Sequence, residues 1–121
     1  MAWIDNEKPV APDIINFQLL NKDFANDEII ISCVNKNFTK GVGIKQYAIY
    51  ISPEIKTLKD VPIYKLITSQ SEINFPIKSI SADWKYVYVA ISAVSKRNNE
   101  SSISKIFTFQ RSGEHWILSE P

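Results

Sequence analysis

Apolar side chains recur at every second position along most of the chain, in short runs separated by residues typical of turns. The clearest run covers residues 87–94, where Val87, Val89 and Ile91 share one parity. This spacing places alternate side chains on opposite faces of an extended strand. No helical stripe longer than two turns occurs, so the pattern predicts an all-β protein. Including that run, we expect seven strands, at residues 14–20, 28–34, 44–51, 63–67, 73–77, 87–94 and 103–109.

The kinds of apolar residue favour the same conclusion. The chain has 19 Ile and 7 Val but only 5 Leu and 7 Ala, and β-branched side chains suit a pleated surface. Seven consecutive strands with hairpin-length gaps favour antiparallel pairing and predict an immunoglobulin-like sandwich of two sheets. Because Pro76 has no amide hydrogen, we place the strand at 73–77 at an edge of its sheet or near its own end.

A length of 121 residues allows one domain. We expect a lead-in at residues 1–8, the domain at 9–110 and a C-terminal tail at 111–121. The tail contains Trp116-Ile117-Leu118, which is an eighth strand, a docked segment or the start of the next part of a longer protein. The first residues lack the basic and apolar stretches of a secretion signal, which leaves a cytosolic protein or a piece of a longer exported one. The proline-rich stretch at residues 9–12 favours the second, because such stretches are typical of linkers between modules.

The charge balance bears on partners. A net charge of +1 argues against a nucleic-acid or anionic-membrane partner, since those need a surplus of Lys and Arg. No apolar run approaches the roughly 20 residues of a membrane span, so we expect no membrane insertion.

The sequence offers few residues for catalysis or metal binding. His115 is the only histidine, and it lies in the tail without a nucleophile motif beside it. Cys33 lies in an Ile-rich strand, which predicts a buried structural thiol. One Cys and one His cannot supply the four ligands of a structural zinc site, and most carboxylates fall in turns. We therefore predict no catalytic residue, no metal site and no cofactor.

Aromatic side chains are the one ambiguous signal. Tyr50 and Tyr88 fall on the face opposite to the apolar positions of their strands. Trp84 lies just before the strand that contains Tyr88. Exposed aromatic rings stack on sugar rings or anchor a partner protein. The alternative is that these three rings cover the sheet and pack against the tails.

Three segments together resemble a fibronectin type III domain over residues 9–110. They are Pro9-x-x-Pro12-x-Ile14-x-x-Phe17, Gly43-Ile44-x-x-Tyr47-x-Ile49-Tyr50, and Ile91-Ser92-Ala93-Val94-Ser95 with Asn99-Glu100-Ser101 after it. The Tyr-rich strand and the Asn-Glu-Ser turn also resemble the module on the C-terminal side of the catalytic domain in exported bacterial glycoside-hydrolase-like proteins. The resemblance implies a seven-stranded sandwich with no enzymatic activity of its own.

Two positions depart from the family pattern. Cys33 stands where the family has a core tryptophan, and Trp84 or Phe38 is expected to fill the vacated volume. The tyrosine that begins the sixth strand of the family falls at Tyr86 by one count and at Val87 by another. A β-bulge would reconcile the two counts.

These observations lead to two functional hypotheses. The first is a non-catalytic accessory or spacer module of a larger exported bacterial protein, extracellular or periplasmic and carbohydrate-active, which positions the adjacent domains of its own polypeptide. The second is a recognition module that binds a carbohydrate or protein ligand through exposed aromatics or an edge strand.

Overall fold

The computed structural model describes residues 9–21, 28–39, 43–54, 56, 58, 60–68, 70–78, 84–112 and 115–119. These residues form eight strands, one more than the seven expected from the sequence. The strands are β1 (Ile14–Asn21), β2 (Glu28–Asn35), β3 (Ile44–Ser52), β4 (Lys65–Thr68), β5 (Glu72–Lys78), β6 (Tyr86–Ser95), β7 (Phe107–Ser112) and β8 (His115–Ser119).

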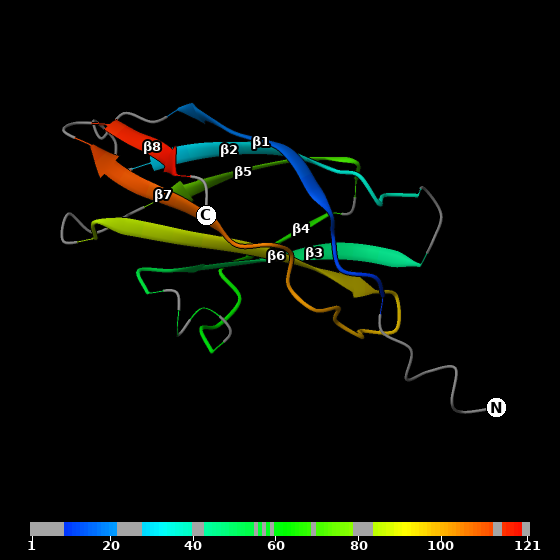
Figure 1. Cartoon of the computed structure of the whole chain (residues 1–121). Helices are drawn as coiled ribbons and strands as arrows, with labels where there is room; N and C mark the ends of the chain where they lie inside the picture. Colours follow the sequence, from blue (N-terminus) through cyan, green and yellow to red (C-terminus); the bar gives the residue numbers. More distant parts are fainter. Residues whose placement is uncertain are drawn as a thin grey trace.

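The strands form two antiparallel sheets. One sheet has the order β1-β2-β5 and the other the order β4-β3-β6-β7-β8. In Figure 1, β1, β2 and β5 lie above β3, β4 and β6, whereas β7 and β8 of the five-stranded sheet rise at one end to the level of β2. The predicted all-β architecture of two antiparallel sheets is therefore confirmed.

The period-two pattern explains where the main core lies. In β2 and β5, Ile29, Ile31, Ile73 and Phe75 are almost fully buried, and the residues between them are more exposed. Because successive side chains of a strand point to opposite faces, one parity from each sheet meets in the middle. The main core is made by Ile14, Phe17, Ile29, Ile31, Cys33, Tyr47, Ile49, Ile73, Phe75, Ile77, Val87, Val89, Ile91, Ala93, Phe107, Phe109 and Trp116.

Both edges of the three-stranded sheet are irregular. Pro76 lies opposite Ile30 in β5, which is an edge strand as its proline predicted. In β1 the register with β2 shifts twice, and Asn16 at the first shift has a φ of 52°. Asn tolerates this left-handed conformation better than most residues, whereas a β-branched residue would be strained in it. Asn16 therefore suits the irregular position at this register shift.

The strand expected at residues 103–109 begins only at Phe107. Before it, the amides of Ser101 and Ser104 donate to the carbonyls of Ala93 and Ile91 at 2.8 and 2.7 Å. The hydroxyls of these two serines accept from the amides of Ala93 and Ile91 at 2.9 and 3.0 Å. Each serine thus makes the two hydrogen bonds that a paired strand residue would make, one through its backbone amide and one through its hydroxyl. The two serines are three residues apart, whereas their partners in β6 are two residues apart. In this segment the serine hydroxyls accept the bonds that the backbone carbonyls of a strand would accept. The apolar pattern of residues 103–106 could not predict this substitution.

The C-terminal tail forms the eighth strand. β8 pairs with β7, placing Trp116 opposite Arg111 and Leu118 opposite Phe109. The Trp116 side chain is buried in the main core, and the Arg111 guanidinium lies 4.9 Å from its ring centroid. Of the three alternatives for the tail, the structure shows the strand, so the residues that complete the core extend beyond 110.

The two family departures have different outcomes. Cys33 is fully buried, and both Trp84 and Phe38 are partly buried against the main core. The bulge expected between Ile80 and Ala93 does not lie within β6 from Tyr86 to Ala93, since the ladders that β6 makes with β7 and β3 run without interruption there. The register shift lies in β3 instead, between Ile44 and Gln46. Residues 79–83, which form the corner before Tyr86, lie outside the described residues.

Candidate functional site

The three aromatic candidates do not form one surface. Tyr50 is only 8% exposed and Tyr88 is half-buried, and both belong to a small cluster on the outer face of the five-stranded sheet. Trp84 packs against the main core instead. The structure therefore places Tyr50 and Tyr88 on the outer face, as the sequence indicated. Tyr50 is covered there, however, and Trp84 lies against the main core.

A polar network holds Tyr50 in place. Its hydroxyl donates to Glu100 Oε2, and the Ser92 hydroxyl donates to the same oxygen at 2.7 Å. Burial, reinforced by the hydrogen bond and the negative charge of Glu100, raises the pKa of Tyr50 to about 12. The Tyr50 hydroxyl stays neutral and uses its only proton in the bond to Glu100, so it acts as a structural link between the two side chains.

Cys33 and His115 are the remaining sequence candidates for a reactive group. Burial raises the pKa of the Cys33 thiol to about 12, so the thiol stays protonated at neutral pH and cannot act as a nucleophile. His115 begins β8, and its side chain lies outside what the structure describes. Within the described ranges no three His, Cys, Asp or Glu side chains come close enough to hold a metal ion.

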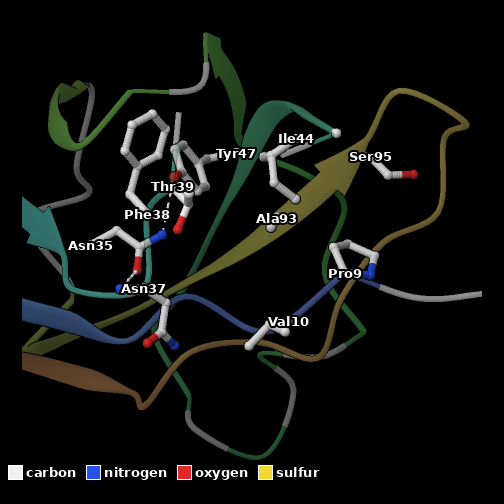
Figure 2. Close-up of a pocket in the computed structure, with 11 residues that line it drawn as sticks. Pro9, Val10, Asn35, Asn37, Phe38, Thr39, Ile44, Tyr47, Ala93 and Ser95 are labelled. Carbon is white, nitrogen blue, oxygen red and sulfur yellow. Dashed lines mark hydrogen bonds between the residues drawn. The ribbon is translucent and has the colours of Figure 1, made fainter. Parts of the chain in front are cut away.

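One end of the sandwich carries a pocket, which we call the pole pocket (Figure 2). β1 begins at this end, β2 and β6 finish there, and β3 starts there, so the pocket lies among the ends of these strands. The pocket has a volume of about 400 Å³. It is lined by Pro9, Val10, Asn35, Asn37, Phe38, Thr39, Gly43, Ile44, Tyr47, Ala93 and Ser95.

Asn35 organises the inner wall of the pole pocket. Its amide nitrogen donates to the Tyr47 hydroxyl at 3.1 Å, and its side-chain oxygen accepts from the backbone amides of Asp13 and Asn37, both at 3.0 Å. The Lys36 amide donates to the Asp13 carbonyl at 2.7 Å. One buried side chain thus joins the incoming chain, the turn after β2 and Tyr47 of β3.

A tight turn after β6 forms the opposite wall. The Ser95 hydroxyl accepts from the backbone amides of Arg97 and Asn99 at 3.2 and 3.1 Å, and Asn98 at the tip has a φ of 66°. The Lys96 amide donates to the Gly43 carbonyl at 2.7 Å, which ties this turn to the start of β3. Both walls are therefore fixed by backbone hydrogen bonds.

The pole pocket combines apolar surface with hydroxyl and amide groups, and among the described residues that line it none carries a charge at neutral pH. Concave sites of this size and mixture bind small molecules. The sequence did not identify this site, because Asn35 and Asn37 had the composition of an ordinary turn. The signal that was available is the triplet Asn37-Phe38-Thr39, in which an aromatic residue stands between two polar ones.

Three of the four edge strands, β1, β5 and β4, are poorly suited to pairing with a peptide. β1 is broken by two register shifts, and Pro76 removes an amide from β5. β4 has only four residues. Bulges, prolines and short edges are the usual protection against strand addition.

Neither a family model nor a curated protein matches this chain. No described helix is long and apolar enough to cross a membrane.

Proposed function

We propose that the chain is a fibronectin type III-like module that acts as a non-catalytic spacer in a larger exported bacterial protein and positions the domains beside it. The strand partition supports the fold type. In immunoglobulin-type sandwiches the first, second and fifth strands share a sheet and the third, sixth and seventh share the other. β1, β2 and β5 make one sheet here, while β3, β6 and β7 are adjacent in the other.

The observation that carries the spacer role is the anchored entry of the chain. The backbone of Asp13 is bonded to Asn35 and Lys36, and the side-chain nitrogen of Asn37 donates to the Ala11 carbonyl at 3.4 Å. A linker fixed in this way enters the sandwich in one direction, so a domain attached to it has restricted orientations. The exported, carbohydrate-active context rests on the resemblance of the Tyr-rich strand and the Asn99-Glu100-Ser101 turn.

Amide relaxation measurements on the intact chain test the anchored entry. The Asp13 amide should show an order parameter near 0.85, as in rigid backbone. In Asn35→Ala it should fall below about 0.6, because the bond from the Asp13 amide is lost and the turn that carries Asn37 loses the bond that holds it. Asn74→Ala, on the exposed face of β5, is the matched control and should leave Asp13 ordered. A flexible Asp13 in the unmodified chain would contradict the spacer role.

A hydrolysis assay tests the non-catalytic part of the proposal. The purified chain should not cleave model aryl glycosides. Cleavage that disappears when the carboxylates of the chain are replaced one by one would overturn this part, whatever the relaxation data show.

A second candidate function is recognition of a carbohydrate or protein ligand. The observation that favours it is the pole pocket, which lies among the turns at one end of the sandwich. Turns held by a rigid scaffold commonly carry binding sites.

A further inference from the structure

A pocket on the outer face of the five-stranded sheet, which we call the Glu100 pocket, contains a carboxylate. It is lined by Tyr50, Glu100, Ser101, Ser102 and Ile103 and has a volume of about 430 Å³. Small-molecule sites typically have volumes of roughly 300–1,000 Å³. We propose that this pocket binds a primary ammonium group carried on an alkyl chain, with Glu100 as the anion that holds it. This site is separate from the pole pocket, and the inference goes beyond the functions proposed above.

Two hydroxyls hold the Glu100 carboxylate in one orientation. The Tyr50 hydroxyl donates to Glu100 Oε2, and the Ser92 hydroxyl donates to the same oxygen at 2.7 Å. Ser92 is fully buried, Tyr50 is 8% exposed, and both lie in the ladder between β3 and β6. A ligand therefore meets a carboxylate whose position is already fixed, so little conformational entropy is lost when it binds.

The negative charge of Glu100 is not neutralised within the described part of the chain. Glu100 is half-buried, and it forms no ion pair with a residue that the structure describes. A carboxylate that is partly removed from water attracts a cation more strongly than a fully exposed carboxylate does, because water screens the charge less. The pocket therefore favours a positively charged ligand.

The hydrogen bonds that Glu100 already makes favour an ammonium over a guanidinium. Each carboxylate oxygen has about two lone pairs, and the hydroxyls of Tyr50 and Ser92 occupy those of Oε2. Glu100 Oε1 accepts no hydrogen bond from a described residue. A guanidinium binds a carboxylate best through both oxygens at once, whereas an ammonium is a compact charge that can bind a single oxygen. The charged end of the ligand should therefore resemble that of a lysine side chain.

The other lining residues suit the alkyl chain behind the charge. Tyr50 and Ile103 belong to the apolar cluster of the outer face, and Ile103 is only partly buried there. Methylene groups can cover this apolar surface while the charged end of the chain reaches Glu100. Ser102 is exposed, and its hydroxyl makes no hydrogen bond to another described residue, so it can accept a second N–H of the ammonium.

The test is a titration of the intact, isotope-labelled chain with two ammonium compounds. One is pentylammonium, and the other is lysine with its α-amino group acetylated and its carboxyl group converted to the N-methylamide. Binding is followed by the amide shifts of Glu100, Ser102 and Ile103 and by the shift of the Glu100 carboxylate carbon. We expect saturable shifts with at least one of these compounds. Pentanol and the matching norleucine derivative lack the charge and should bind about tenfold more weakly.

The two ammonium compounds distinguish two sources of the same chemistry. Binding of pentylammonium without the lysine derivative would identify a small free amine as the ligand. Binding of the lysine derivative would identify a lysine side chain of a partner as a ligand of the pocket. Both results support the ammonium site.

Two matched variants assign the binding to Glu100. Glu100→Gln keeps the size of the side chain and an oxygen that can accept from Tyr50 and Ser92, but it removes the charge, so binding should weaken about tenfold. Glu72→Gln makes the same change at an exposed position of β5 and should leave binding unchanged. A second measurement needs no variant, because raising the NaCl concentration to about 1 M should weaken binding of the ammonium compounds but not of pentanol.

Several outcomes would overturn the proposal. They are the absence of saturable shifts with both ammonium compounds, shifts confined to residues outside the Glu100 pocket, equal affinities of Glu100→Gln and Glu72→Gln, and binding of pentanol as tight as that of pentylammonium. Tighter binding of the matching arginine derivative than of the lysine derivative would also contradict it. None of these outcomes bears on the spacer role, which the relaxation and hydrolysis measurements test separately.

Discussion

The inner and outer faces of the five-stranded sheet are built from the same strands and are buried by different means. On the inner face, Tyr47, Ile49 and Ile91 meet the other sheet and belong to the main core. On the outer face, the neighbouring positions of the same strands hold Ala48, Ala90 and the covered ring of Tyr50.

The outer face is covered by loops. Leu58, from the loop between β3 and β4, is fully buried there, and Val61, Ile103 and Ile106 are partly buried beside it. Figure 1 shows this loop on the side of the five-stranded sheet away from β2 and β5. Small residues in the strands let a loop approach closely, and the loop brings fewer apolar atoms than a second sheet would.

This comparison shows that burial against a sheet and burial under a loop differ in what stabilises them. The inner face depends mainly on apolar area and has a buried hydrogen bond from Asn35 to Tyr47 at one end, whereas the outer face has the polar link from Tyr50 and Ser92 to Glu100. Substitutions on the inner face should therefore cost most of the stability and those in the polar link least.

Trp116→Ala should give the largest effect. The indole is 2% exposed in the main core, so its removal should lower the free energy of unfolding by about 3–5 kcal/mol. Chemical denaturation measures this change. Ile117→Ala is the matched control in the same strand, is 44% exposed in the wild-type chain, and should cost no more than about 0.5 kcal/mol. Equal, small effects for both variants would mean that β8 is not part of the core.

Leu58→Ala should give an intermediate effect. The side chain is fully buried under the outer face, but a loop can collapse into part of the space, so we expect a loss of about 2–3 kcal/mol. Leu66→Ala, also on a position facing outward from this sheet, changes an exposed leucine and should be nearly silent. A loss as large as that of Trp116→Ala would remove the distinction between the two faces.

Tyr50→Phe should give the smallest effect. It removes one of the two hydroxyls that hold Glu100, and the Ser92 hydroxyl remains, so the expected loss is about 1 kcal/mol. Tyr86→Phe changes an exposed tyrosine in the next strand and serves as the control.

The pH dependence sharpens this prediction. Because the folded pKa of Tyr50 is raised to about 12 from an ordinary value near 10, its stabilising contribution is complete below pH 10. That contribution should be lost as the pH rises from about 10 through 12, since the ionised phenolate is disfavoured beside Glu100. Ultraviolet titration should show a phenolate absorbance step near pH 12 that is lost in Tyr50→Phe. A Tyr50 that ionises together with exposed tyrosines would contradict the buried link.

Particular strands show how far the sequence could predict the fold. The run at Val87, Val89 and Ile91 predicted β6, and Pro76 predicted an edge strand, because both signals are local properties of the backbone. The start of β7 was wrong by four residues, because Ser101 and Ser104 bond to β6 through their hydroxyls. These hydroxyl bonds need the partner strand β6, so the apolar pattern of residues 103–109 could not reveal them.

The candidate site was harder to predict than the fold. Alternation placed Tyr50 on the outer face, but the loop that carries Leu58 decides that it is covered. The pole pocket joins Pro9, Asn35 and Ser95, which are far apart in the chain. Only the convergence of strand ends at one pole makes these residues neighbours.

The sequence alone determined the class of this protein, since the period of two and the abundance of isoleucine constrain each strand through its own backbone and side chains. Tertiary structure decided which strands share a sheet, which aromatic rings are covered, and where a ligand-sized pocket lies. The physical reason is range: strand formation depends on neighbours along the chain, whereas burial and pockets arise from groups that meet only when distant segments pack together.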